Sequence, residues 1–502
     1  MKKIFFLFML FFSTSLLTAQ QIHVDSLCRK AYVEILSLRF APALKMLKKE
    51  KQFHPENVYV DYLENYMDFL RVFIGENPAL FNKLNNSFGQ RYSRIKQLPD
   101  TCRYKNLLLA NMNLQWAFAR LKFRQYFTAA WELNRAYRML TDNVNRFPRF
   151  LPDYITLGVL HVMIGLVPDK YGWMLKIISM KGSVKQGKAE LYNVLDNALK
   201  NPSEVYLRDE ALFYLGFIEL NLAPDQKALD KLMVYLNKTN KDNLLMDFLK
   251  IDIHIHYGQN EMALKELNNV PNGPDYFPFY YLDFLKGQCY LRKMEPDSAI
   301  IYIHYFLKHF NGINYIKDAW RKEAWAVLLK GNVSGYRQLM DSVINHGAVE
   351  VGSDKEALQE AQSEKIPNIS LLKARLLFDG GYYARAKTVL NNMDTIPLTA
   401  PELLERIYRY ARIAHRQDHI AKAKKEYLMT IALGSSSPLY FAGNAALKLG
   451  EIYETQDSLT LAKKYYNKCL HMNFDEYRNS IRGQAKEALA RIKQKEISTA
   501  GN

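Results

Sequence analysis

His415 and His419 have a spacing that could form a metal site. They are four residues apart, so a helix would place both imidazole rings on one face, as two metal ligands require. Arg412 and Arg416 lie in the same stretch, and their positive charges oppose a bound cation. No glutamate lies between the two histidines. We therefore expect no metal site here.

Other patterns of enzyme chemistry are missing from the sequence. It contains no glycine-rich phosphate loop, no Gly-x-Ser-x-Gly elbow and no Cys-x-x-Cys pair. The soluble lytic transglycosylases are exported enzymes that contain an α-superhelix. Their catalytic Glu is followed by Ser, and this chain has no Glu-Ser dipeptide. We expect no catalytic residue and no cofactor, and a peptidoglycan-acting enzyme is the least favoured function.

The elements that carry these residues follow a repeat. Near the C-terminus, Ala446-x-x-Leu449-Gly450-x-x-Tyr453 is followed by Ala462-x-x-x-Tyr466. This spacing resembles the tetratricopeptide repeat, in which small residues let two antiparallel helices approach closely. The same twelve-residue interval joins Ala31 to Ala43, Gly216 to Ala228, Ile251 to Ala263, Gly287 to Ala299, Ala374 to Ala386, Ala411 to Ala423 and Gly450 to Ala462.

The resemblance implies an all-α, right-handed superhelical solenoid of helix pairs in two arms. Residues 319–329 and 336–343 have helical spacing and indicate one degenerate repeat, and the turn-forming residues after them indicate a joint. We expect these segments: a signal peptide at 1–19, a divergent helical region at 20–200, repeats at 201–345, the joint at 346–368, C-terminal repeats at 369–496 and a tail at 497–502.

One repeat near the N-terminus is interrupted. It begins well at Tyr154-x-x-Leu157-Gly158, but its second small residue is Gly187, an interval of 29 residues. The region around it, roughly residues 100 to 200, resembles the tetratricopeptide repeat protein 39 family and the related inclusion-body clearance proteins. That resemblance implies a helical scaffold without known catalytic residues.

The interruption places an extra stretch at 168–186. Its apolar residues fit a short helix from which lysines extend, and two interpretations remain open. The stretch is a plug over the end of the N-terminal groove, or it is a membrane or partner contact that uses Trp173, Lys176 and Lys181.

The N-terminus has the pattern of an export signal. Lys2 and Lys3 precede an apolar run that ends near Ala19, where we expect cleavage, and placement in the periplasm or at the outer membrane follows. The formal net charge of +17 favours an anionic envelope surface and argues little for nucleic acid in an exported protein. Four dispersed cysteines do not form a disulfide framework, so buried thiols are expected, with a pair between Cys28 and Cys102 as the alternative.

The function that remains is an exported scaffold that binds a protein segment in its concave groove. The alternative is a glycan-binding or nutrient-binding outer-membrane protein of the SusD-like kind; the oligomeric state stays open. In each repeat, the positions three before and one after the first small residue should face the groove. The alternative is that several of the phenylalanines pack between neighbouring repeats. These positions are Phe213, Phe217, Phe248, Asp252, Phe284, Gln288, Leu371, Arg375, Tyr408, Arg412, Leu447 and Glu451.

Overall fold

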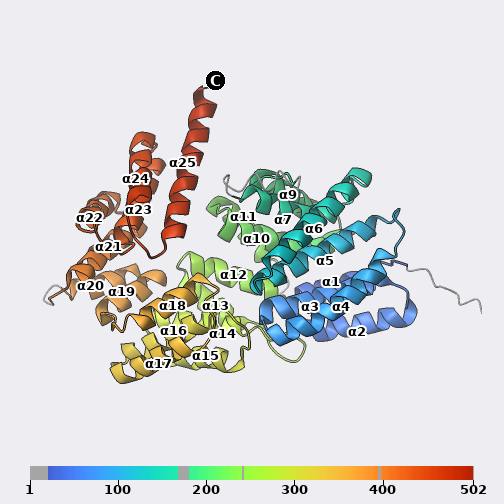
Figure 1. Cartoon of the computed structure of the whole chain (residues 1–502), viewed down its shortest axis with the longest axis horizontal. Helices are drawn as coiled ribbons and strands as arrows, with labels where there is room; N and C mark the ends of the chain where they lie inside the picture. Colours follow the sequence, from blue (N-terminus) through green and yellow to red (C-terminus); the bar gives the residue numbers. More distant parts are fainter. Residues whose placement is uncertain (1–20, 168–179, 240–241, 394–396, 501–502) are drawn as a thin grey trace, which may run out of the picture. The chain divides into compact units, whose positions relative to one another are not determined.

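The computed structural model describes residues 21–167, 180–239, 242–393 and 397–500 (Figure 1). Over these residues the secondary structure is helical, with a single isolated bridge between Gln21 and Asn57. The predicted all-α fold of paired helices is therefore confirmed. No helix in the described ranges is both long and apolar enough to cross a membrane.

The chain forms two compact units. The first contains the residues up to Leu249 together with 271–278, and the second contains 250–270 and the residues from Phe279 onward. The division thus falls inside helix α12 and not at the predicted joint. The helices of the first unit are α1 (Ser26–Leu36), α2 (Phe40–Phe53), α3 (Val58–Gly75), α4 (Pro78–Lys96), α5 (Arg103–Lys122), α6 (Tyr126–Arg146), α7 (Asp153–Gly165), α9 (Val184–Lys200), α10 (Arg208–Phe217), α11 (Gln226–Leu236) and the start of α12 (Leu244–His256), with short turns η2 (Val205–Leu207) and η3 (Ile218–Leu222).

The second unit continues the helix pairs. Its helices after α12 are α13 (Asn260–Asn269), α14 (Tyr281–Lys293), α15 (Pro296–His309), α16 (Ile316–Leu329), α17 (Val333–Asn345), α18 (Gly352–Gln362), α19 (Ile369–Asp379), α20 (Tyr383–Asn391), α21 (Ala400–Arg416), α22 (Ile420–Leu433), α23 (Phe441–Thr455), α24 (Leu459–His471) and α25 (Arg478–Ala500).

The small residues of the twelve-residue interval lie where two helices of a pair touch. Ala411 on α21 and Ala423 on α22 are both fully buried. A Cβ added at Gly450 would lie 2.6 Å from the ring of Tyr466, and one added at Gly287 would lie 2.5 Å from Ile303. Glycine is needed at these two positions because the facing side chain already fills the space.

The interrupted repeat closes in the predicted way. Helices α7 and α9 form a pair, and a Cβ at Gly187 would lie 2.2 Å from the carbonyl oxygen of Gly158. Of the inserted stretch, Trp173 and Lys176 lie outside the described residues. The side chain of Lys181 is exposed, and its backbone N–H and carbonyl group both bond to the hydroxyl of Tyr137 at 3.0 Å.

Within the predicted joint at 346–368, the turn-forming residues are followed by a helix. Helix α18 packs on α16 and α17, with Asp354, Ala357 and Ala361 buried. Asp354 accepts hydrogen bonds from the backbone N–H groups of Tyr315 (2.7 Å) and Asp318 (2.9 Å) at the start of α16. The turn-forming residues therefore end before 352, and a short helix with two small apolar residues follows them.

The four cysteines are free thiols in the structure, so Cys28 and Cys102 do not pair. Cys28, Cys289 and Cys469 are buried, as predicted, and Cys102 is half-buried. The predicted signal peptide at 1–19 lies outside the described residues.

Candidate partner-binding surface in the second unit

Six residues of the second unit form a continuous series of contacts that combines two arginines with four aromatic rings. Helix α19 contributes Arg375 and Phe378, helix α21 contributes Tyr408 and Arg412, and Tyr440 and Tyr477 precede helices α23 and α25. We call these six residues the Arg–Tyr cluster.

Most of these contacts bring together elements that are distant in the chain. The Tyr477 hydroxyl lies 3.5 Å from a guanidinium nitrogen of Arg375, and the ring of Tyr477 lies 4.8 Å from that of Tyr440. Tyr440 packs edge-on against Tyr408 at 5.8 Å, and Arg412 donates a 2.8 Å hydrogen bond to the Tyr408 hydroxyl. Helices α19 and α21 thus each contribute one arginine to the cluster.

The repeat register explains why these arginines point to the same side. Arg375 follows Ala374 and Arg412 follows Ala411, and both alanines are fully buried between paired helices. One residue further along a helix, the side chain has rotated by about 100°. Both guanidinium groups therefore leave the helix contact and are half-buried.

Neither guanidinium forms an ion pair with a described residue. Arg375 has the weak contact with Tyr477 and lies 5.2 Å from the ring centre of Trp325. Arg412 lies 4.9 Å from the ring centre of Phe378. Cation–π contacts hold a guanidinium in place while leaving its N–H donors available. The cluster thus presents two fixed positive charges.

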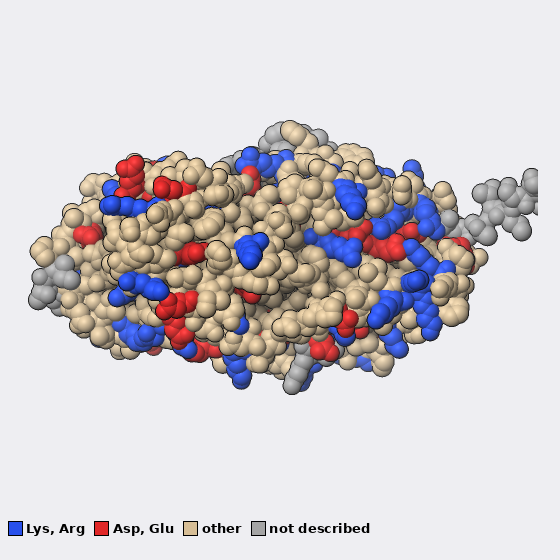
Figure 2. Space-filling model, turned by 90° about the horizontal axis from the view of Figure 1, so that it is seen from below, with Lys and Arg blue, Asp and Glu red and all other residues tan. Residues whose placement is uncertain are grey.

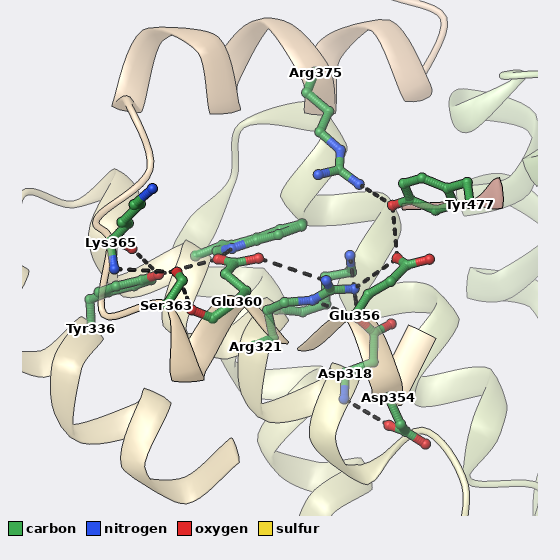
Figure 3. Close-up of polar contacts among 12 residues, drawn as sticks. Asp318, Arg321, Tyr336, Asp354, Glu356, Glu360, Ser363, Lys365, Arg375 and Tyr477 are labelled. Carbon is green, nitrogen blue, oxygen red and sulfur yellow. Dashed lines mark hydrogen bonds and ion pairs between the residues drawn. The ribbon is translucent and has the colours of Figure 1, made fainter. Parts of the chain in front are cut away.

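A second group of charges adjoins the cluster and is satisfied internally. Arg321 on α16 is 4% exposed, and its Nε donates to Asp318 at 3.0 Å. Its other nitrogens lie 3.9 Å from Glu356 and 3.7 Å from Glu360, both on α18 (Figure 3). Burial alone would raise the pKa of Asp318, but Lys322 and Arg321 hold it below its ordinary value.

One hydroxyl joins this network to the Arg–Tyr cluster. Tyr477 donates a 2.8 Å hydrogen bond to Glu356, and burial together with the neighbouring carboxylate raises the pKa of Tyr477 to about 12 despite the opposing charge of Arg375. The Tyr477 hydroxyl therefore stays protonated at neutral pH. It can accept from a guanidinium while donating to a carboxylate, so the hydroxyl lies between Arg375 and Glu356 (Figure 3). The carboxylates of Asp379 and Glu405 also act on Arg375, from beyond ion-pair distance.

The structure separates the residues predicted to line a groove into two classes. Side chains one position after the small residue are partly exposed: Phe217, Asp252, Gln288, Arg375, Arg412 and Glu451. In the second unit, the side chains that lie three positions before the small residue are buried: Phe284, Leu371, Tyr408 and Leu447. Phe284, which is 1% exposed, packs on Phe306 and serves the core, the alternative left open for these phenylalanines. In the first unit Phe213 and Phe248 are half-buried.

Sequence reasoning missed Arg321, Trp325 and Tyr477. The sequence does carry a signal for Arg321 and Trp325. Ala324 and Tyr336 are separated by the same twelve-residue interval, but the second residue of this pair is large instead of small. Arg321 and Trp325 stand three before and one after Ala324, the same register as the predicted positions. For Tyr477 the sequence carries no such signal, because its hydrogen-bond partners lie more than 100 residues away.

The histidine pair forms no common site. His415 bonds to the Tyr427 hydroxyl at 3.2 Å, and burial lowers the pKa of His415. His419 is the N-cap residue of α22. In the first unit Asp25, Cys28 and Glu50 lie close together, but Asp25 caps α1 through the Cys28 N–H and Glu50 bonds to Asn57 at 2.7 Å. These carboxylates have structural roles.

The second unit also has an open cavity of about 440 Å³ on another side of α19. Its walls are mainly apolar, and Lys373 and Arg385 add two positive charges. The lining residues are Met294, Pro296, Leu329, Lys373, Leu377, Arg385, Thr388 and Val389.

Comparisons with known proteins give structural matches only. No protein-family model and no curated protein sequence matches the chain. Similar solved structures include a human IFIT1 dimer with PPP-AAAA, 14% identical, covering 90% of this chain and 96% of IFIT1 with a TM-score of 0.31. A monomeric IFIT1 mutant with Gppp-AAAA is also 14% identical, with coverages of 89% and 95% and a TM-score of 0.32. TM-scores this low carry no inference about what the present chain binds.

Proposed function

We propose that the chain is a non-enzymatic scaffold of the cell envelope whose second unit binds an acidic protein segment on the Arg–Tyr cluster. The observation that carries the proposal is the pair of guanidinium groups, Arg375 and Arg412, which are held against aromatic rings without a carboxylate partner among the described residues.

The mechanism is recognition by charge and geometry. Carboxylates of the partner segment would take up the free N–H donors of both guanidinium groups, and such charge-assisted hydrogen bonds are the strong ones. The partly exposed ring of Tyr440 offers apolar surface beside the charges, and the buried ring of Phe378 supports Arg412 from below. The cost of ordering is small because Tyr408 and Tyr477 already orient the two arginines.

Synthetic peptides test this proposal directly. Fluorescence polarisation would compare labelled decapeptides rich in Asp and Glu with neutral peptides of equal length. In the variant with Arg375→Gln and Arg412→Gln, we expect affinity for the acidic peptides to fall at least about tenfold, because hydrogen bonds to charged groups contribute about 1.5 to 3 kcal/mol each. Arg491→Gln is the matched control, since Arg491 already pairs with Glu454 at 2.8 Å.

Two results would contradict the proposal. One is equal binding of acidic and neutral peptides to the unaltered chain; the other is unchanged affinity in the double variant, with circular dichroism showing that it is folded. Capture of an RNA oligonucleotide that depends on the same two arginines would assign the surface to nucleic acid instead.

The proposed location rests on the pattern from Met1 to Ala19, and N-terminal sequencing of the exported protein tests it. A start at Gln20 is expected. Relationship to the tetratricopeptide repeat protein 39 family is likewise proposed, from the residues around Gly158 and Gly187.

A further inference from the structure

The turn between α5 and α6 exposes large apolar side chains to solvent. Leu121 at the end of α5 is 37% exposed, and Tyr126, Phe127 and Trp131 at the start of α6 are 57%, 96% and 61% exposed. Phe127 and Trp131 are four residues apart and share one face of α6. We call these four residues the aromatic tip.

The fold does not require the aromatic tip to be apolar. Helix α6 packs through a different face, on which Ala129, Ala136 and Leu140 are fully buried. The turn is held firmly by other residues, because the ring of Phe123 stacks on that of Phe81 at 4.5 Å. Exposed apolar groups on a rigid turn are a feature of contact sites.

The surroundings of the aromatic tip are strongly basic. Residues 78–146, which form α4, α5 and α6, contain twelve Lys and Arg residues and three Asp and Glu residues, a net charge of +9 within a chain of +17. The one acid near the aromatic tip, Glu132, is buried and bonds to Arg120 at 2.9 Å. Exposed acids are therefore absent from residues 119–140. On the face shown in Figure 2, Lys and Arg side chains lie in groups with Asp and Glu side chains between them.

Cations and rings of the aromatic tip lie in direct contact. The guanidinium group of Arg135 lies 5.0 Å from the ring centre of Trp131 and 4.8 Å from that of Tyr92. Arg124 in the turn and Arg138 one helical turn further are exposed. Positive charge thus surrounds the apolar side chains without covering them.

We propose that the aromatic tip docks the first unit on an anionic lipid bilayer. Trp and Tyr rings favour the headgroup region, and Leu121 and Phe127 would enter the upper acyl region. The arginines would meet lipid phosphates, to which the net positive charge is complementary. A lipid surface fits better than a nucleic acid because the exposed side chain of Leu121 can neither stack on a base nor bond to a phosphate, whereas it is stabilised among acyl chains.

Vesicle cosedimentation tests the docking with the chain from Gln20 onward, since the apolar residues 4–12 would bind lipid by themselves. Vesicles of phosphatidylglycerol and phosphatidylcholine are compared with vesicles of phosphatidylcholine alone. Replacing Tyr126, Phe127 and Trp131 by Ser should weaken partition into the anionic vesicles at least about tenfold. Arg124→Gln and Arg138→Gln should weaken it roughly fivefold for each lost charge, and added salt should act in the same direction.

A control removes three exposed apolar side chains elsewhere. Leu428, Met429 and Leu433 on α22 are 42%, 47% and 53% exposed, and their replacement by Ser should leave vesicle binding unchanged. All substituted side chains are exposed, so thermal melts should match those of the unaltered chain. Phe127→Ser alone, at the most exposed position, provides a milder variant with a measurable loss of binding.

Three outcomes would overturn the proposal. The aromatic-tip variant sediments with anionic vesicles as the unaltered chain does, or the α22 control loses binding to the same extent. Alternatively, the unaltered chain ignores lipid, and the aromatic-tip variant instead loses a concentration-dependent dimer or binding to a single-stranded oligonucleotide, which would assign the aromatic tip to a second copy or to nucleic acid.

Discussion

Removing the charge of Arg321 should destabilise the second unit strongly. The substitution Arg321→Met keeps most of the buried volume. It leaves the carboxylate of Asp318, whose side chain is 7% exposed, with one remaining cation, the Lys322 ammonium group at 3.6 Å. Breaking a buried ion pair on one side costs about 3 to 5 kcal/mol. Because Lys322 remains and Glu356 and Glu360 are less buried, we expect the lower end, about 3 kcal/mol.

The assay is thermal and urea unfolding, with hydrogen exchange of α16 and α18 to localise the effect. A loss of about 3 kcal/mol lowers the midpoint of a unit of this size by about 6 to 12 °C. Arg491→Met is the control, because its ion pair with Glu454 is 62% exposed on the arginine side and should contribute less than about 1 kcal/mol.

A double variant tests the reasoning itself. If the cost arises from the uncompensated carboxylate, adding Asp318→Asn to Arg321→Met should recover much of the lost stability, a clear departure from additivity. A loss below about 1 kcal/mol for Arg321→Met, or purely additive losses in the double variant, would show that the network does not depend on this charge pair.

Three further predictions concern the first unit. Gly187→Ala should destabilise it by about 3 kcal/mol in urea unfolding, because the new Cβ would lie 2.2 Å from a backbone oxygen. Gly483→Ala is the control and should not destabilise the protein, because a Cβ there would have no atom within 4 Å. Equal effects of the two substitutions would contradict the close helix contact. Burial raises the pKa of Asp153 to about 7, so the folded state binds more protons than the unfolded state, and stability should fall as the pH rises from about 4 to about 7 and then level off. Asp153→Asn should flatten that profile, and an unchanged profile would refute the assignment. Glu210→Ala should cost about 2 kcal/mol or more because it leaves the buried hydroxyls of Tyr32 and Tyr66 without their acceptor, and a melt unchanged from the unaltered chain would refute this.

The sequence alone determines the repeat architecture of this protein. The twelve-residue interval predicts the helix pairs, because the close approach of two consecutive helices depends on residues a short distance apart in the chain. The interrupted repeat also forms its helix pair, because Gly158 and Gly187 meet across the insertion. The outward direction of Arg375 and Arg412 could also be predicted, since helical rotation is a local property.

Tertiary structure decided which of those side chains stay available. The carboxylates of α18 lie close to Arg321, while Arg375 and Arg412 form no ion pair within the described part of the chain. Tyr477 contacts Arg375 from 102 residues away. The aromatic tip likewise became visible only once the packing of α6 showed which of its rings remain exposed. Periodicity reports which face of a helix a residue occupies, but exposure and pairing depend on long-range contacts that a repeat pattern does not encode.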